Sequence, residues 1–252
     1  MPQGFRHPEI LQIIERDGKV TVDGLAAHFG VTLQTIRRDL ADLSETKKIE
    51  RVHGGAIRAS GTNNIQYEER RLLNAASKSA IASACAAQIP DNCSLCLNIG
   101  TTTEAVARAL QGHRGLLVVT NNLNVASILE TNDRIETIVT GGRLRLSDGG
   151  LVGAMAIESI KKFKFDCAIV GCSALDADGD LLDFDVEEVG VSQAIISQAR
   201  TVNVVADSSK LTRSAPARIA SLSAASALFT DKRLSDALAQ RCKGWKTEVI
   251  VV

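Results

Sequence analysis

The stretch V-T-L-Q-T-I-R-R-D-L at residues 31–40 decides how the N-terminal part of the chain folds. Ile36 and Leu40 are four residues apart and share one face of a helix, which leaves Arg37 and Arg38 on the opposite side. An earlier helix is predicted by a second apolar stripe, which ends before Gly30 and consists of Val22, Leu25, Ala26 and Phe29. Two helices joined by a short turn that contains a glycine form the helix-turn-helix pattern.

A hairpin and a linker are predicted after this pair of helices. Residues 49–56, I-E-R-V-H-G-G-A, alternate apolar and polar side chains and then bring two glycines, which predicts a β-hairpin wing. Residues 58–66 have loop composition. We therefore predict a winged helix-turn-helix domain over residues 1–57 and a linker over residues 58–75.

The second predicted helix has the side chains that DNA recognition requires. Such a helix fits the major groove, where arginine pairs with guanine and glutamine with adenine, and threonine hydroxyls bind phosphates. We expect one of Arg37 and Arg38 to read a base and the other to hold a phosphate. The predicted DNA-contacting residues are Thr32, Gln34, Thr35, Arg37, Arg38, Arg51 and His53.

A solvated charged helix face is the alternative interpretation of this helix. Arg37 or Arg38 would then pair with Asp39 or Asp42. Their position in a helix-turn-helix, followed by a glycine-rich basic hairpin, favours DNA binding. His53 is explained equally well as a turn residue or as a DNA contact.

From residue 76 onwards, strands and helices alternate. Apolar runs predict strands at 95–99, 116–120, 135–139, 167–170, 202–206, 227–230 and 248–252, and helices are predicted at 103–110, 123–129, 156–162 and 186–199. Continuous apolar runs are typical of parallel strands whose two faces are both covered. We predict a doubly wound α/β domain over residues 76–252.

Polar or glycine-rich turns follow several of these strands and predict a site for a phosphorylated ligand. In doubly wound sheets, ligands bind beyond the carboxyl ends of the strands, and helix N-termini there bind anions. The predicted effector-binding residues are Asn98, Gly100, Thr101, Thr102, Asn121, Asn122, Gly141, Gly142, Arg143 and Lys210. Taken singly, Thr101, Thr102, Asn121 and Asn122 are better explained as helix caps, Gly141 and Gly142 as turn residues, and Lys210 as a surface charge; four such turns at strand ends favour one shared pocket.

The composition excludes several classes of protein. The formal net charge is zero, which argues against a strongly basic nucleic-acid coat protein. No apolar run of 18 residues predicts a membrane span, and the N-terminus has no signal-peptide pattern, so we expect a cytoplasmic protein with no membrane partner. Cys93 and Cys96 form a C-x-x-C without a second pair or nearby histidines. We therefore predict neither a metal nor a cofactor.

The sequence resembles the DeoR-type family of sugar-metabolism repressors. The family signature pairs T-I-R-R-D-L, here at 35–40, with R-x-H-G-G-A, here at 51–56, and has an early arginine, here Arg6. Thr32 stands where serine is usual, and both residues cap helices. The resemblance extends to about residue 231 and includes I-G-T-T at 99–102, T-N-N-L-N-V-A at 120–126 and a D-x-S-K motif that ends at Lys210.

This resemblance implies a partner, an effector and an assembly. It implies a C-terminal domain related to sugar-phosphate isomerases, binding of double-stranded operator DNA, and a homo-oligomer, either a dimer or a tetramer. The effector that it implies is a phosphorylated sugar or polyol that releases the DNA, with glycerol 3-phosphate first and fructose 1-phosphate as the alternative. Residues 190–193 depart from the family, because relatives have basic residues there and this chain has Gly190, Val191, Ser192 and Gln193.

A sugar-phosphate isomerase is the rival prediction. Asp183, Asp185, Glu187 and Glu188 are its candidate acid and base groups. However, Ser192 and Gln193 stand where an isomerase would need its acid–base pair, and a DNA-reading domain serves no purpose in such an enzyme. We predict a regulator and not an enzyme, and the sequence leaves open whether it also activates transcription.

Overall fold

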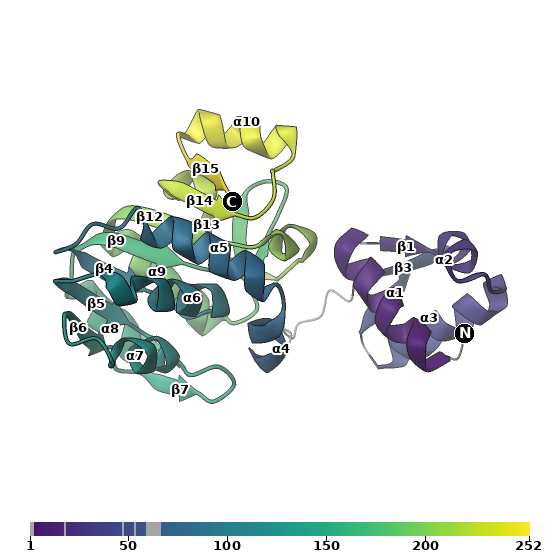
Figure 1. Cartoon of the computed structure of the whole chain (residues 1–252), viewed down its shortest axis with the longest axis horizontal. Helices are drawn as coiled ribbons and strands as arrows, with labels where there is room; N and C mark the ends of the chain where they lie inside the picture. Colours follow the sequence, from purple (N-terminus) through teal and green to yellow (C-terminus); the bar gives the residue numbers. More distant parts are fainter. Residues whose placement is uncertain (1–2, 18, 47, 53, 59–66) are drawn as a thin grey trace.

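The computed structural model describes residues 3–17, 19–46, 48–52, 54–58 and 67–252 (Figure 1). Its N-terminal unit contains three helices, α1 (Gln3–Asp17), α2 (Val22–Phe29) and α3 (Leu33–Glu45). Three antiparallel strands accompany them in the order β1 (Lys19–Thr21), β3 (Gly55–Arg58) and β2 (Ile49–Val52). This arrangement confirms the predicted winged helix-turn-helix.

Local signals in the sequence explain where α2 and α3 begin and end. Thr21 caps α2 by accepting a hydrogen bond from the Gly24 amide (3.1 Å), and Gly30 ends the helix in the left-handed region with a φ of 63°. Thr32 caps α3 in the same way by accepting from the Thr35 amide (3.2 Å). The buried apolar residues of these helices form one core with the sheet, as their spacing predicts.

Strand β1 was not predicted, and it explains the second glycine of the wing. Lys19–Thr21 pairs antiparallel with β3, with Thr21 opposite Gly55. A Cβ atom on Gly55 would lie only 1.9 Å from the carbonyl oxygen of Val20. Residue 55 must therefore lack a side chain so that the two strands can approach each other.

The C-terminal domain is built on a parallel sheet of seven strands, whose positions match the seven predicted ones. They are β4 (Ser94–Leu97), β5 (Leu116–Thr120), β6 (Ile135–Val139), β9 (Phe165–Val170), β12 (Ala199–Val205), β14 (Ala227–Thr230) and β15 (Glu248–Val251). Their order across the sheet is β15-β14-β12-β9-β4-β5-β6. The chain moves from β4 to β5 and β6, and then crosses back to β9 on the other side of β4.

Helices cover both faces of this sheet, as a doubly wound fold requires (Figure 1). One face packs against α5 (Ala75–Ala86), α6 (Thr101–Ala109) and α7 (Leu123–Leu129), and the other packs against α8 (Ala154–Lys161), α9 (Val186–Gln198) and α10 (Asp236–Trp245). Side chains alternate between the two cores: Leu95 and Leu97 join the α5 side, and Cys96 joins the α9 side. None of the helices in the described part of the chain is long and apolar enough to cross a membrane.

Several short elements lie around the sheet and were not predicted. They are the hairpin β7 (Arg143–Arg145) and β8 (Gly150–Val152), the small antiparallel sheet of β10 (Ala174–Leu175), β11 (Asp180–Asp183) and β13 (Ala217–Ser221), and the 3-10 turns η1 (Leu110–Gly112), η2 (Ser208–Thr212) and η3 (Leu222–Ala224). Runs of two to five residues are too short for their periodicity to show. Two of them, β11 and η2, place side chains at the carboxyl end of the large sheet.

A short helix, α4 (Tyr67–Leu72), lies within the range 58–75 that was predicted as linker. It is held against the C-terminal domain by a hydrogen bond that the Tyr67 hydroxyl donates to Glu104 Oε2 (2.9 Å). The ammonium of Lys78 donates to the carbonyl of Leu73 (2.5 Å) and to that of Arg70. The part of the predicted linker from Tyr67 onwards is therefore packed structure, and residues 59–66 lie outside the described residues.

The core on the α5 side allows a test of the packing. Phe229 of β14 is fully buried there. We expect Phe229→Ala to lower the free energy of unfolding by about 3–5 kcal/mol, because it removes a large apolar side chain and leaves a cavity. Denaturant titration measures this change. Val251→Ala on the neighbouring strand β15 is the control, since Val251 is 45 % exposed and should change little. Equal effects of both substitutions would contradict this account of the core.

Candidate functional site

The recognition face of α3 is exposed and bears the predicted polar residues. Ile36 and Leu40 are buried in the domain core, while Gln34, Arg37 and Arg38 are exposed. The hydroxyl groups of Thr32 and Thr35 lie 2.9 Å apart at the start of the helix, where Thr32 serves as the cap. The first turns of α3 therefore present polar side chains to solvent, together with Leu33, which is 40 % exposed.

Asp39 does not neutralise this surface. Its carboxylate is buried and accepts from Arg6 Nε (2.7 Å) and Arg6 Nη2 (3.1 Å), with His7 Nε2 at 3.4 Å. Within the described residues, neither Arg37 nor Arg38 forms an ion pair. The interpretation in which an arginine pairs with Asp39 is therefore not what the structure shows. The early arginine of the family signature instead ties α1 to the inner side of α3.

The wing supplies the remaining predicted DNA contacts. Arg51 lies in β2, opposite Ala56 of β3. His53 lies outside the described residues, so its predicted contact stays a prediction. Gly54 follows it with a φ of 79°, which a tight turn between two strands requires.

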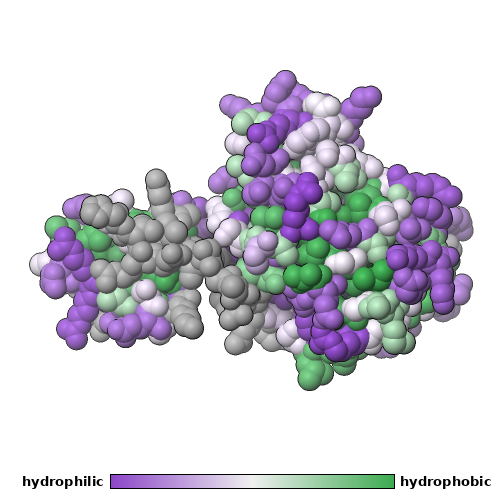
Figure 2. Space-filling model, turned by 180° about the vertical axis from the view of Figure 1, so that it is seen from behind, coloured by the Kyte–Doolittle hydropathy of each residue, from purple (hydrophilic) through white to green (hydrophobic). Residues whose placement is uncertain are grey.

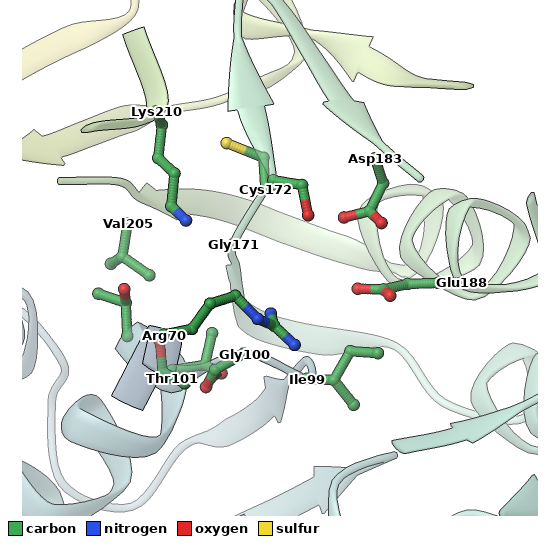
Figure 3. A pocket seen from close by; sticks show the side chains of 13 residues that line it. Arg70, Ile99, Gly100, Thr101, Gly171, Cys172, Asp183, Glu188, Val205 and Lys210 are labelled. Atoms are coloured by element: carbon green, nitrogen blue, oxygen red, sulfur yellow. Dashed lines mark hydrogen bonds between the residues drawn. The ribbon is translucent and has the colours of Figure 1, made fainter. Parts of the chain in front are cut away.

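A pocket opens at the carboxyl ends of β4 and β9. These neighbouring strands are where the chain reverses its direction of travel across the sheet, so the loops that follow them diverge. The residues that line the pocket are Arg70, Ile99, Gly100, Thr101, Thr102, Thr103, Gly171, Cys172, Ser173, Asp183, Glu188, Val205 and Lys210 (Figure 3). They surround about 360 Å³ of space, part of it open to solvent. Among the predicted effector residues, the fold brings together Gly100, Thr101, Thr102 and Lys210.

One wall of the pocket has the chemistry of an anion site. Lys210 is 9 % exposed, and no hydrogen bond of the described residues uses its ammonium group. Burial, together with the charge of Arg213, lowers the pKa of Lys210 to about 8. The N-terminus of α6 lies beside it; its cap residue, Gly100, offers no side chain to the first amides, which remain available to an anion.

Further cations surround this wall. The Arg70 guanidinium extends from α4 into the pocket, pairs with Asp148 Oδ2 at 3.2 Å, and leaves its Nε without a hydrogen-bond partner among the described residues (Figure 3). Burial lowers the pKa of Lys78, and the charges of Arg213 and Arg70 act in the same direction. Asp207 caps η2, the turn that contains Lys210, and its pKa is lowered: burial works against this, but the charge of Lys210 and a hydrogen bond from Ser209 outweigh it.

The opposite wall is acidic. Asp183 ends β11, and Glu188 lies in the first turns of α9, where its Oε2 pairs with Arg145 Nη2 at 2.6 Å. Burial, with the nearby charge of Asp183, raises the pKa of Glu188 to about 8 although Arg145 opposes the shift. Arg145 also contacts Asp148 and Asp185 at 2.7 and 2.8 Å, so its charge is shared among three carboxylates.

Three predicted asparagines have structural roles outside the pocket. Asn98 is buried and donates to the Ser192 hydroxyl (2.8 Å). Asn121 donates to the Leu151 carbonyl (3.2 Å), and Asn122 caps α7 by accepting from the Asn124 amide (2.9 Å). They hold loops together at the strand ends, and Asn122 has the role of helix cap that was the alternative interpretation.

The predicted turn at 141–143 is also separate from the pocket. Gly141 lies against Met155, and Gly142 lies close to the backbone of Val152. Arg143 is largely exposed and forms an ion pair with Glu187. These three residues follow β6, at the edge of the sheet and two strands away from β4, which explains why they do not reach the pocket.

Sequence reasoning missed Arg70 and the binding potential of Asp183 and Glu188. Arg70 lies in a segment whose composition predicted a linker, and no local signal places it beside Lys210, which is 140 positions further along the chain. The two carboxylates were noticed only as acid–base candidates. The other positions considered for that chemistry have structural contacts, because Ser192 accepts from Asn98 and Gln193 donates to the Ile219 carbonyl (3.2 Å).

Comparisons with known proteins agree with both halves of this architecture. The DeoR-like helix-turn-helix domain matches residues 6–62, and the DeoR C terminal sensor domain matches residues 73–232. The glycerol-3-phosphate regulon repressor of Haemophilus influenzae is 42 % identical over 251 residues and covers 100 % of this chain and 98 % of the relative. The repressor of the same name from Escherichia coli is 42 % identical and covers 92 % of each chain.

Solved structures show more distant similarity. Ribose 5-phosphate isomerase A from Methanocaldococcus jannaschii aligns with a TM-score of 0.41 at 14 % identity, over 55 % of each chain. The fold and the two sites define a DNA-binding regulator that carries a winged helix-turn-helix and a sensor domain. By its match to both domain models and to its relatives along the whole chain, this protein belongs to the DeoR family.

The exposed arginines of α3 allow a test of DNA recognition. We expect Arg37→Ala and Arg38→Ala each to weaken operator binding. The base-reading arginine should lose about 1–3 kcal/mol together with sequence preference, and the phosphate-binding one should weaken binding to all DNA alike. Salt-dependent fluorescence anisotropy with operator and scrambled DNA separates the two. Arg114→Ala in the C-terminal domain, where Arg114 is exposed, is the control. Unchanged binding in both α3 variants would show that another surface reads the DNA.

Proposed function

We propose that this protein represses a glycerol or carbohydrate catabolic operon and is released from its operator by a phosphorylated polyol or sugar, glycerol 3-phosphate first. The observation that carries the proposal is the buried ammonium of Lys210, which has no hydrogen bond within the described residues and lies beside the open N-terminus of α6. A phosphate group supplies the missing charge and accepts hydrogen bonds from both. Two relatives that match nearly the whole chain are named as glycerol-3-phosphate regulon repressors.

The residues proposed to bind the effector are fewer than the sequence predicted. Gly100, Thr101, Thr102 and Lys210 remain, because all four line the pocket. Arg70 is added to this set as a second cation. Asn98, Asn121, Asn122 and residues 141–143 support the loops around the pocket and are no longer proposed as ligand contacts.

Arg70 also suggests how binding reaches the DNA-binding domain. It belongs to α4, which begins directly after residues 59–66, and its guanidinium pairs with Asp148. An anion in the pocket competes with Asp148 for the Arg70 guanidinium and thereby displaces α4. This displacement changes the position of the segment that leads to the DNA-binding domain. A coupling of about 1–3 kcal/mol weakens operator binding about 5- to 150-fold.

A homo-oligomer is part of the same proposal. Regulators of this class present two reading helices to repeated half-sites, which requires at least two copies. Figure 2 shows hydrophobic residues in the middle of one face of the C-terminal domain, framed by hydrophilic ones. Met155 and Val186, at the starts of α8 and α9, are 69 % and 74 % exposed. Exposed apolar side chains of this kind favour association, and light scattering gives the number of copies.

Lys210→Ala tests the anion site. We expect this variant to bind operator DNA as the unchanged protein does, but to bind glycerol 3-phosphate at least about tenfold more weakly, because a charge-assisted hydrogen bond contributes about 1.5–3 kcal/mol. Its operator complex should also resist release by the effector. Titration calorimetry and anisotropy measure the two properties, with the exposed Lys162 changed to alanine as the control. Undiminished effector binding in Lys210→Ala would refute the proposed site.

The pH dependence of effector binding provides a second test. The pKa of Lys210 is lowered to about 8 and that of Glu188 is raised to about 8. As the pH rises through 8, the pocket loses a positive charge and gains a negative one, so effector affinity should fall by roughly tenfold or more between pH 7 and pH 9. Lys210→Arg should flatten this decline, since arginine stays charged. Affinity that is constant or rises over this range would contradict the assignment.

The proposal is for binding without conversion of the ligand. Glycerol 3-phosphate and ribose 5-phosphate incubated with the protein should be recovered unchanged, as NMR spectroscopy can establish. Isomerisation of the sugar phosphate would instead favour the rival enzyme function.

A further inference from the structure

The pocket has two walls of opposite charge, and the proposed phosphate site occupies only one of them. Figure 3 shows Lys210 on one side of the cavity, with Asp183 and Glu188 facing it from the other. The cationic wall explains how a phosphate is bound, but it does not explain why buried carboxyl groups lie across the same cavity. A role for the acidic wall rests on the proposed function and concerns the part of the ligand beyond the phosphate.

Asp183 holds an acceptor ready in the cavity. Its Oδ1 accepts from the amides of Phe184 (2.7 Å) and Asp185 (3.4 Å), which fixes the orientation of the carboxylate at the end of β11. Within the described part of the chain, no hydrogen bond uses its Oδ2. The residue is 3 % exposed and lines the pocket, so a bound ligand is the natural partner of this oxygen.

Glu188 offers a second carboxyl group to the cavity, and it differs from Asp183 in its hydrogen-bonding capacity. Arg145 holds its Oε2 at 2.6 Å, and no hydrogen bond among the described residues uses its Oε1. Burial and the charge of Asp183 raise its pKa to about 8. At neutral pH Glu188 is therefore largely a carboxylic acid that can donate a hydrogen bond, while Asp183 Oδ2 can accept one.

We propose that Asp183 and Glu188 are specificity-determining residues that bind the hydroxyl groups of the effector and reject phosphorylated compounds with a carboxylate in their place. A hydroxyl group of the ligand donates a hydrogen bond to Asp183 and accepts one from Glu188, so it is used both as a donor and as an acceptor. A ligand carboxylate brings a second negative charge against Asp183. Arg145 does not neutralise it, because Asp148 and Asp185 already share that guanidinium.

The test compares two ligands of the same carbon number. Glycerol 3-phosphate and 3-phosphoglycerate both contain a phosphate on a three-carbon chain, and they differ in a terminal hydroxymethyl group against a carboxylate. Titration calorimetry at pH 7 measures both, together with inorganic phosphate, on the full-length protein. We expect the unchanged protein to prefer glycerol 3-phosphate by at least about 100-fold, a discrimination that a site built around hydroxyl groups readily reaches.

Three variants locate the source of this preference. We expect Asp183→Asn and Glu188→Ala each to weaken glycerol 3-phosphate binding by about tenfold or more and to reduce the preference over 3-phosphoglycerate by a similar factor. Glu187→Ala is the matched control: Glu187 lies on the same helix, is largely exposed and pairs with Arg143 outside the pocket, so both affinities should remain unchanged. Inorganic phosphate, which has no hydroxymethyl group, should bind all three variants at least as well as the unchanged protein.

The outcomes separate this inference from the proposed function. Equal affinity of the unchanged protein for the two ligands, or variants that weaken both ligands by one factor, would overturn the role of the carboxylates and leave the phosphate site standing. Failure of all three compounds to bind would remove both proposals. Circular dichroism checks the fold of each variant, and if Asp183→Asn does not fold, Glu188→Ala alone decides the question, because alanine is readily accommodated in a helix.

Discussion

A buried ammonium group without a hydrogen-bond partner among the described residues is the constraint on which the sensor site depends. Charged groups are unfavourable in the protein interior unless an opposite charge or hydrogen bonds compensate for the lost water. Burial and the charges of Arg213 and Arg70 act against the ammonium of Lys210, while the charge of Asp207 stabilises it. The charge of Lys210 is therefore only partly compensated, and in the proposed function an anionic effector supplies the rest of the compensation. In that proposal, the effector changes the balance of charge between the walls of the pocket, which is how its binding alters the protein.

The location of this constraint follows from the strand order. A parallel sheet that grows first to one side of β4 and then to the other leaves a crevice between β4 and β9, because their following loops run in opposite directions. Segments from distant parts of the chain close that crevice: α4 before the sheet, β11 and α9 in its middle, and η2 near its end. The cationic and acidic walls come from different segments, so a single pocket acquires two kinds of chemistry. The participation of α4 connects the pocket to the segment that leads to the DNA-binding domain.

The winged helix-turn-helix illustrates how far local signals reach. The caps Thr21 and Thr32, the stop at Gly30 and the apolar stripes of α2 and α3 were all readable, because each acts within one or two helical turns. The same stretch did not reveal that Asp39 points inward to Arg6, 33 positions away. The signature T-I-R-R-D-L therefore combines two functions that only the fold separates: arginines face outward, and the aspartate braces the helix from within.

By itself, the sequence determined the two domains' fold classes, the seven strands of the large sheet, and the membership of Gly100, Thr101, Thr102 and Lys210 in a strand-end site. These features depend on apolar periodicity, on helix caps and on the tendency of turns to follow strands, all of which are properties of neighbouring residues. Only the tertiary structure decided which strand ends meet, and hence that Asn121, Asn122 and Arg143 stay outside while Arg70, Asp183 and Glu188 enter. The physical reason is that strand order depends on the packing of whole helices against both faces of the sheet, and no short stretch of sequence encodes it.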